Sequence, residues 1–344
     1  MSQLPTGYFR SVYEPRGLFI NDHCLILHQD TWHLFYIPGL TQEHWTHPQS
    51  MLDLGHATSP DLLTWTPQPP VLPVTESQGW WEKGKVFAPF VIRHNDSFYM
   101  FYCGIGDVHQ ERIGLATSDD LYHWTRYDGN PIIWPSKSWA RYGAVESGET
   151  SACRDPHVLP HDSYGFIMYW VGDVKGDPPY TCVAASISHD LVHWQEYGPL
   201  LKLRHHEGPG TASMESVGVV RYASRYFMFF NYKYGTYWAA SPDPLDWEGR
   251  EIHFLSTSHA SEVFPWQDKW YITSCCKPPE QAASYPAFFK GLFLGQLGWD
   301  HFSVSIPPEP IGAREGHFSD GMQAEEIYPR VLEAEEIGGP MALR

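Results

Sequence analysis

Alternating hydrophobic and polar residues recur along the chain in short runs, and each alternating run is followed by a run rich in aromatic residues. In the first unit an Asn21-Asp22 pair opens the alternating run and the aromatic run Trp32–Tyr36 follows. The unit ends at 59–65 in a turn of the form Ser-x-Asp-Leu-x-x-Trp. Alternation with a period of two predicts half-buried β-strands, and turn residues between them predict hairpins. No stretch before the C-terminal tail shows the hydrophobic period of a helix, so the pattern predicts an all-β protein.

This unit occurs five times, each time with about four short strands, and a radial arrangement of four-stranded sheets is a β-propeller. We therefore predict a five-bladed β-propeller that forms a single domain over residues 1–344. The expected blades and the C-terminal tail are 17–75, 84–135, 151–203, 211–255, 259–300 and 301–344. Within the tail, 324–332 is either a short packing segment or a closing strand.

The repeated turn has a structural interpretation. Its Asp is expected to accept hydrogen bonds from the backbone of the turn, and its Trp to pack between neighbouring blades. Copies stand at 59–65, 118–124 and 188–194, and a related form stands at 241–247.

The formal net charge is −17, although only 18% of the residues are charged, and 15% are aromatic. An acidic surface argues against nucleic acid and anionic membranes as partners and suits a neutral substrate. The six cysteines lack the paired spacing of a zinc site, and most lie in apolar runs, so we interpret them as reduced, buried thiols. The N-terminus has no signal-peptide pattern, and no run of about 18 apolar residues occurs, so we expect a cytoplasmic protein without a membrane span. The oligomeric state is not predicted.

Acidic residues open three of the units. Because the first strand of each propeller blade lines the central axis, Asp22, Asp155 and Glu215 are expected at equivalent places around one funnel. Converging carboxylates raise at least one pKa, and glycoside hydrolysis needs one protonated and one ionised carboxyl group. Arg154 would offset part of the repulsion and bind sugar hydroxyls. The alternative is a solvated ring of acids without chemistry.

Other residues are weaker candidates for contact with a sugar. Glu262 and His259 open the fifth unit and are expected to line the floor of the funnel, and Phe87 opens the second. Metal binding at 205–207 is less favoured than a solvated loop. Loop tryptophans that could stack on a sugar are Trp45, Trp80, Trp81, Trp139 and Trp238.

Several motifs, taken in order over about 280 residues, resemble those of one enzyme family. They are Pro15–Asp22 (P-x-x-G-W-M-N-D-P), Trp32–Tyr36 (H-L-F-Y-Q), 44–65 (H-W and G-H-A-x-S-x-D-L-x-x-W), Arg154–Pro156 (R-D-P) and Met214-Glu215 (E-C). Together they resemble the β-fructofuranosidases of glycoside hydrolase family 32, the invertases, levanases and inulinases, with relatives in family 68.

The resemblance implies a five-bladed propeller that acts with retention of configuration and without metal or cofactor. Asp22 would be the nucleophile, Asp155 the transition-state stabiliser and Glu215 the general acid/base. Asn21 and Arg154 would hold substrate hydroxyls. The C-terminal β-sandwich usual in the family is not expected, because the chain ends soon after the fifth unit.

Some positions depart from the family pattern. His23 follows Asp22, Ser216 stands where Cys usually follows the acid/base, and Phe87–Pro89 resembles the arabinanase and β-xylosidase group instead. The leading prediction is an exo-acting glycosidase that cleaves a terminal furanoside with retention of the anomeric configuration. A β-D-fructofuranoside is the favoured substrate. The alternatives are an inverting arabinofuranosidase or xylosidase, a fructosyl-transferring enzyme, and a non-catalytic carbohydrate-binding propeller.

Overall fold

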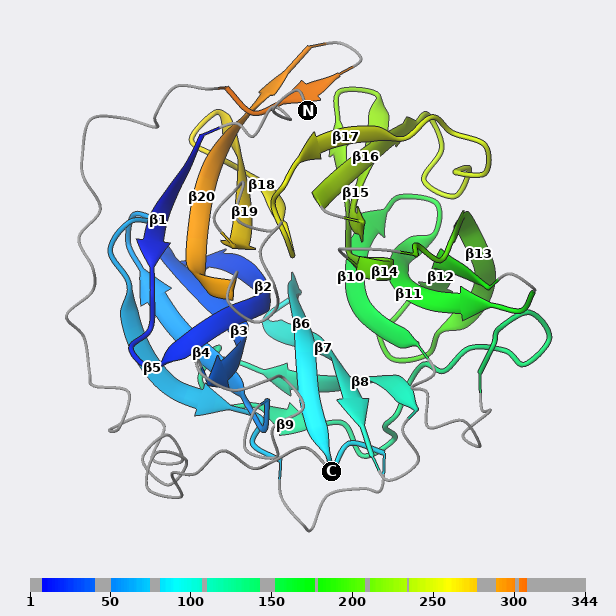
Figure 1. Cartoon of the computed structure of the whole chain (residues 1–344). Coiled ribbons are helices and arrows are strands. Elements are labelled where there is room, and N and C mark those ends of the chain that lie inside the picture. Colours follow the sequence, from blue (N-terminus) through cyan, green and yellow to red (C-terminus); the bar gives the residue numbers. More distant parts are fainter. Residues whose placement is uncertain are drawn as a thin grey trace, which may run out of the picture.

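The computed structural model of the protein describes residues 8–40, 51–74, 81–106, 110–142, 152–176, 179–207, 211–233, 235–276, 289–300 and 303–307. Within these ranges the only regular elements are β-strands, which form five sheets around one axis (Figure 1). The all-β, five-bladed propeller predicted from the sequence is therefore confirmed. Among the described residues no helix is long and apolar enough to cross a membrane.

Four blades are antiparallel sheets of four consecutive strands. The first contains β2 (Leu18–His28), β3 (Thr31–Leu40), β4 (Leu54–Ser59) and β5 (Thr66–Val71). The second contains β6 (Lys85–His94), β7 (Ser97–Ile105), β8 (Glu111–Ser118) and β9 (Thr125–Arg126). The third contains β10 (Cys153–His161), β11 (Gly165–Val174), β12 (Tyr180–Ser188) and β13 (Gln195–Arg204). The fourth contains β14 (Thr211–Tyr222), β15 (Arg225–Lys233), β16 (Gly235–Ser241) and β17 (His253–Ser256).

The fifth blade is built from both ends of the described chain. It contains β18 (Val263–Trp266), β19 (Lys269–Cys276) and β20 (Phe289–Trp299), and β21 (Val304–Ser305) pairs with β20. Its outer strand is β1 (Phe9–Tyr13), which pairs antiparallel with β20 and closes the ring. The sequence pattern predicted no strand before residue 17, because five residues are too few to establish a period. Most of the tail lies outside the described residues, so its closing strand at 324–332, the absence of a β-sandwich and the extent of the domain stay predictions.

The repeated turn has the structural role predicted for it. In the third blade Asp190 Oδ1 accepts hydrogen bonds from the backbone N–H groups two and three residues later, at 2.9 and 2.7 Å. Trp194 Nε1 donates to the carbonyl oxygen of Leu191, whose φ of 66° is left-handed, at 3.1 Å. The Trp194 ring meets Phe101 of the preceding blade edge to face, with centroids 5.7 Å apart. The turn thus fixes the tryptophan that joins two blades.

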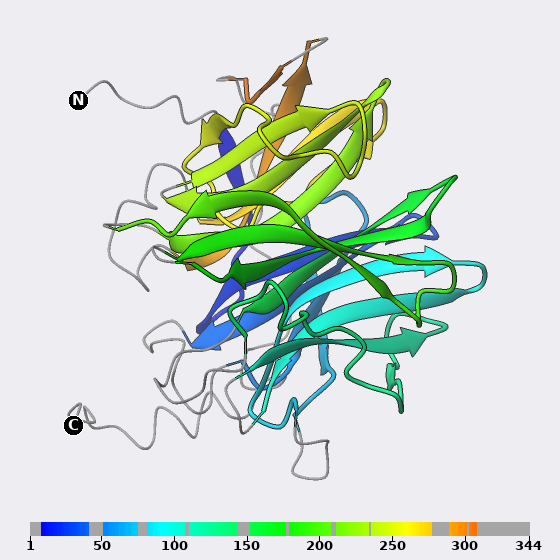
Figure 2. The same ribbon diagram turned by 90° about the vertical axis from the view of Figure 1, so that its right-hand side faces the viewer.

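Neighbouring blades pack face to face (Figure 2), and the tryptophans of these turns contribute to the contact. Trp247 is only 1% exposed and lies in the core between the third and fourth blades. We expect Trp247→Ala to lower the free energy of unfolding by about 3–5 kcal/mol, since it removes a large buried ring. Denaturant titration measures this. Trp134→Ala is the matched control, because Trp134 is 57% exposed and its loss should change stability by no more than about 0.5 kcal/mol. Equal losses in the two variants would contradict this view of the core.

The innermost strands of four blades bulge where they approach the axis, and in each bulge two residues oppose one residue of the partner strand. The bulges lie between Ile20 and His23 in β2, Phe87 and Phe90 in β6, Arg154 and His157 in β10, and Glu215 and Gly218 in β14. Ala88, Asp155 and Ser216 are the first bulged residues of their strands and have left-handed φ angles of 50°, 56° and 53°. Such bulges redirect side chains out of the regular alternation.

Candidate active site

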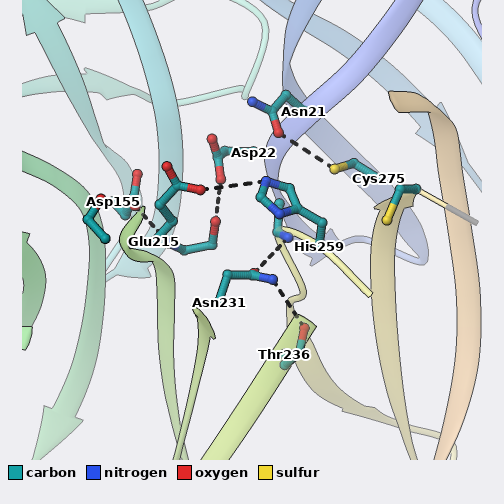
Figure 3. A network of polar contacts seen from close by, with 12 residues as sticks. Asn21, Asp22, Asp155, Glu215, Asn231, Thr236, His259 and Cys275 are labelled. Atoms are coloured by element: carbon teal, nitrogen blue, oxygen red, sulfur yellow. Dashed lines mark hydrogen bonds and ion pairs between the residues drawn. The ribbon is translucent and has the colours of Figure 1, made fainter. Parts of the chain in front are cut away.

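Three carboxylates, those of Asp22, Asp155 and Glu215, meet at the axis where the bulges of β2, β10 and β14 come together (Figure 3). Ser216 connects them. Its backbone N–H donates to Asp155 Oδ2 at 2.6 Å, and its hydroxyl donates to Asp22 Oδ1 at 2.5 Å. Because Ser216 follows Glu215 in the chain, these two hydrogen bonds also keep the Glu215 backbone beside both aspartates.

The expectation that the three acids stand at equivalent places in their blades is wrong. Glu215 is the paired residue at which its bulge begins, Asp155 is the first bulged residue of β10, and Asp22 is the second bulged residue of β2. The structural counterpart of Glu215 in the third blade is therefore Arg154. A bulge holds more than one residue at the axis, so the sequence repeat alone could not distinguish these positions. The three side chains meet at the axis although each occupies a different position in the bulge of its own strand.

Arg154 lies within this cluster and is held by its neighbours. Its guanidinium donates to Glu111 Oε2 at 3.2 Å and to Ser213 Oγ at 2.8 Å, and it lies 3.7 Å from Glu215 Oε1 and 3.8 Å from Asp155 Oδ2. One cation thus faces three carboxylates. The hydrogen bonds that its two terminal nitrogens donate to Glu111 and Ser213 fix the orientation of the planar guanidinium.

Burial controls the protonation of the cluster. It raises the pKa of Glu215 to about 7, against the opposing effect of the Arg154 charge and with a further increase from the charge of Asp22. Burial also raises the pKa of Asp155 well above its usual range, and repulsion by Asp22 adds to this. The pKa of Asp22 is raised by burial, while the hydrogen bond from Ser216 opposes the increase. The site can therefore hold a protonated and an ionised carboxyl group together near neutral pH.

The fifth blade contributes neutral groups to the same site (Figure 3). His259 Nε2 lies 3.9 Å from Glu215 Oε2, and burial lowers the pKa of His259 to about 4, so the ring is neutral at neutral pH. The Cys275 thiol lies 3.6 Å from Asn21 Oδ1 and donates to it. This contact fixes the orientation of the Asn21 amide next to Asp22.

A cavity along the axis is lined by Asp22, Asp155 and Ser216 and reaches Glu262. Glu262 Oε2 accepts a hydrogen bond from the backbone N–H of Leu25 at 3.0 Å, and burial raises the pKa of Glu262 to about 8. Glu262 therefore lines the axis as the sequence predicted.

Phe87 and the tryptophans differ in their surroundings. Phe87 is half-buried at the position in β6 that corresponds to Glu215 in β14, and it packs against the core shared by the first and fifth blades. Trp238 is buried and stacks on His253 with centroids 4.4 Å apart. Trp139 donates its Nε1–H to Glu196 Oε1 at 2.8 Å. Trp45 and Trp80 lie outside the described residues.

The prediction that Trp81 contacts substrate is wrong. Trp81 is 3% exposed and lies in the core shared by the first and second blades, with its ring 5.7 Å from that of Tyr102. Gly104 and Gly114 make room for it, since a Cβ atom at either residue would lie 2.5 or 2.3 Å from the Trp81 ring. The position of Trp81 just before a strand predicted a loop residue, but the two glycines opposite it leave a pocket in which its ring is buried.

The sequence did not single out Glu111 or Ser213 as site residues. Glu111 begins β8 in the second blade, and nothing near it in sequence signals its pairing with Arg154. Ser216 was visible only as a departure from the resembled motif. The six cysteines are free and buried, as predicted. Among the described residues no three His, Cys, Asp or Glu side chains are grouped as metal ligands, and His205 Nε2 instead contacts Asp173 Oδ1 at 3.1 Å.

Comparison with known proteins places this geometry in context. The N-terminal domain model of glycosyl hydrolases family 32 matches residues 13–224. A probable sucrose-6-phosphate hydrolase of Psychromonas ingrahamii is 29% identical over 52% of this chain and 30% of its own length. An insoluble β-fructofuranosidase isoenzyme of Arabidopsis thaliana is 26% identical over 60% of this chain and 34% of its own length. The chain thus spans about a third of the length of these relatives. A thermostable family-43 glycoside hydrolase shares the fold, with a TM-score of 0.65, 16% identity, and coverage of 90% of this chain and 100% of that one.

Proposed function

The chain belongs to glycosyl hydrolases family 32, and on this premise we propose that it cleaves a terminal furanoside, preferentially a β-D-fructofuranoside, with retention of configuration. The carboxyl groups of Asp22, Asp155 and Glu215 converge at the axis, and this convergence carries the proposal. The pKa of about 7 at Glu215 supports it, because it suits a general acid. The names of the relatives, which include a β-fructofuranosidase, support the choice of sugar.

The proposed reaction has two steps. Glu215 donates its proton to the leaving oxygen while Asp22 attacks the anomeric carbon, which breaks the glycosidic bond and leaves the sugar esterified to Asp22. Water then attacks the same carbon, Glu215 takes its proton, and the ester bond to Asp22 breaks. Glu215 loses a proton to the leaving oxygen in the first step and regains one from water in the second, so the enzyme is unchanged after a turnover.

The remaining groups support these steps. Asp155 lies beside Asp22 and is proposed to stabilise the positive charge that develops on the sugar. Arg154 and Asn21 are proposed to hold sugar hydroxyls, because neighbouring side chains already fix the orientation of both polar groups. Phe87, Glu262 and Trp45 remain proposed contacts farther along the substrate.

An inverting glycosidase is the second candidate. The Phe87–Pro89 bulge resembles the arabinanase and β-xylosidase group, and a family-43 glycoside hydrolase shares the fold. In that reaction Asp22 would act as a general base on water, and its carboxyl group would lie roughly 6.5–9.5 Å from that of Glu215 instead of roughly 5–5.5 Å. Transfer to a sugar acceptor would differ from hydrolysis only in the molecule that attacks the intermediate.

A panel of substrates tests the proposal. Sucrose, sucrose 6-phosphate, inulin, levan and the aryl β-fructofuranoside, α-arabinofuranoside and β-xyloside are incubated with the protein, and products are separated by chromatography. Release of fructose, or of fructose 6-phosphate from the phosphorylated sugar, is the expected result. Cleavage of only the arabinofuranoside or xyloside would select the inverting alternative, and cleavage of none would overturn the proposal.

The pH dependence of kcat/KM follows from the pKa of Glu215. The acid form of Glu215 is the active one, so activity should fall tenfold per pH unit as the pH rises well above about 7. At low pH activity should fall again as Asp22 is protonated, because burial raises the pKa of Asp22 above its usual range. Initial rates at low substrate concentration between pH 4 and 9 measure both limbs. An activity that continued to rise through pH 9 would exclude Glu215 as the acid.

A further inference from the structure

Ser216 donates hydrogen bonds to both Asp22 and Asp155, through its hydroxyl and its backbone N–H. The distance of 2.5 Å between its hydroxyl and Asp22 Oδ1 is in the range of a hydroxyl that donates to an ionised carboxylate. The backbone N–H bond to Asp155 prevents the serine from turning away. The hydroxyl is thus directed at one particular oxygen of Asp22.

The hydroxyl, rather than the backbone conformation, is particular to this residue. Ala88 and Asp155 are the corresponding first bulged residues of β6 and β10 and have similar left-handed φ angles. The conformation is therefore a property of the bulge. Ala88 carries no polar group, and Asp155 carries a carboxyl group, so Ser216 alone among these three brings a neutral donor to the cluster.

We propose that Ser216 is a positioning residue that holds Asp22 by Oδ1 and thereby assigns Oδ2 as the oxygen that attacks the anomeric carbon. This inference rests on the proposed role of Asp22 as the nucleophile. A carboxylate bound through one oxygen cannot rotate freely about its terminal bond, so the second oxygen stays aligned for in-line attack. The hydrogen bond from the Ser216 backbone N–H to Asp155 keeps the stabilising carboxyl group in a fixed position relative to Asp22.

The contact also affects the charge of Asp22. Burial favours the neutral acid, whereas donation from Ser216 favours the carboxylate and lowers the pKa of Asp22. The groups facing Asp22 are His23 on its own strand, Arg154 and Asp155 on β10, Glu215 on β14 and Cys275 on β19. Removal of the hydroxyl alone leaves all of these in place, so any resulting change in the pKa of Asp22 reports the loss of this hydrogen bond.

Substitution of Ser216 separates the hydroxyl from the backbone. Ser216→Ala and Ser216→Gly both lack the hydroxyl and keep the N–H bond to Asp155, but glycine adopts a left-handed φ without strain. We expect both variants to lose about 10- to 100-fold in kcat with little change in KM, the scale of one hydrogen bond to a charged group. Ser216→Cys, a weaker donor, should retain intermediate activity. Ser97→Ala is the matched control, since it removes a Ser–Asp hydrogen bond on the surface of the second blade.

A titration that needs no substrate completes the test. The carboxyl signals of ¹³C-labelled aspartates are followed by NMR between pH 2 and 9, and the signal missing from Asp22→Asn identifies Asp22. The inference predicts a higher pKa for Asp22 in Ser216→Ala and an unchanged value in Ser97→Ala. Thermal melting verifies that each variant is folded. An unchanged pKa, or a kcat within about twofold of wild type, would overturn the inference. If the wild-type protein cleaves no glycoside, the proposed function fails, and the titration still decides whether Ser216 controls Asp22.

Discussion

Asp22→Asn is expected to reduce kcat by about 10⁴-fold or more, on the scale found when a hydrolase loses a catalytic carboxylate. The amide has nearly the same shape and can still accept the hydrogen bond from Ser216, but it cannot form the ester with the sugar. Rates with the best substrate of the panel measure the loss, with enough enzyme to detect a residual rate. Asp96→Asn, at an exposed position in the hairpin between β6 and β7, is the matched control and should be fully active.

The size of this loss separates the candidate roles of Asp22. A nucleophile or a general base cannot be replaced by an amide, whereas a carboxylate that only binds a hydroxyl can be replaced with a loss of about tenfold. A modest loss of that kind would contradict the central position assigned to Asp22. It would favour a carbohydrate-binding propeller whose weak activity has another source.

Glu215→Gln is expected to lose about 10²- to 10⁴-fold in kcat/KM on natural sugars, the usual contribution of general acid–base catalysis. On an aryl furanoside the loss should be much smaller, because a phenolate leaves without a proton. The ratio of the two losses is therefore the diagnostic quantity. Equal losses on both substrates would show that Glu215 is not the acid.

The second step of the reaction supplies an independent check on Glu215. Water needs a general base to attack the sugar ester, whereas azide is already an anion and needs none. Azide should therefore accelerate turnover of the aryl substrate by Glu215→Gln and produce a glycosyl azide. Glu196→Gln, which alters an acid that contacts Trp139 away from the axis, is the matched control and should show no acceleration.

Much of the fold follows from local sequence patterns. The alternation of each strand and the turns at its end depend on neighbouring residues only, and the Asp190 and Trp194 contacts show how such a turn closes a blade. The closure of the ring does not follow in this way. Strand β1 pairs with β20, far away along the chain, and its five residues carry too little pattern to reveal the pairing.

The site shows the same division between local and distant information. The identity of the three acids was predictable, because each lies in the innermost strand of its blade, which lines the axis. Their offset within the bulges was not, since it depends on the register with the partner strand. The pairing of Arg154 with Glu111, the burial of Trp81 and the bridge made by Ser216 also depend on contacts between blades or opposite strands.

The configuration of the first product tests the central claim most directly. A furanoside that the panel shows to be cleaved is mixed with a large amount of enzyme, and ¹H and ¹³C NMR spectra are recorded before mutarotation scrambles the anomers. Two displacements at one carbon restore the original configuration, so attack by Asp22 followed by water predicts that the β-furanose appears first from a β-fructofuranoside. Appearance of the α-anomer first would contradict the account, because it would make Asp22 a base that activates water in a single displacement.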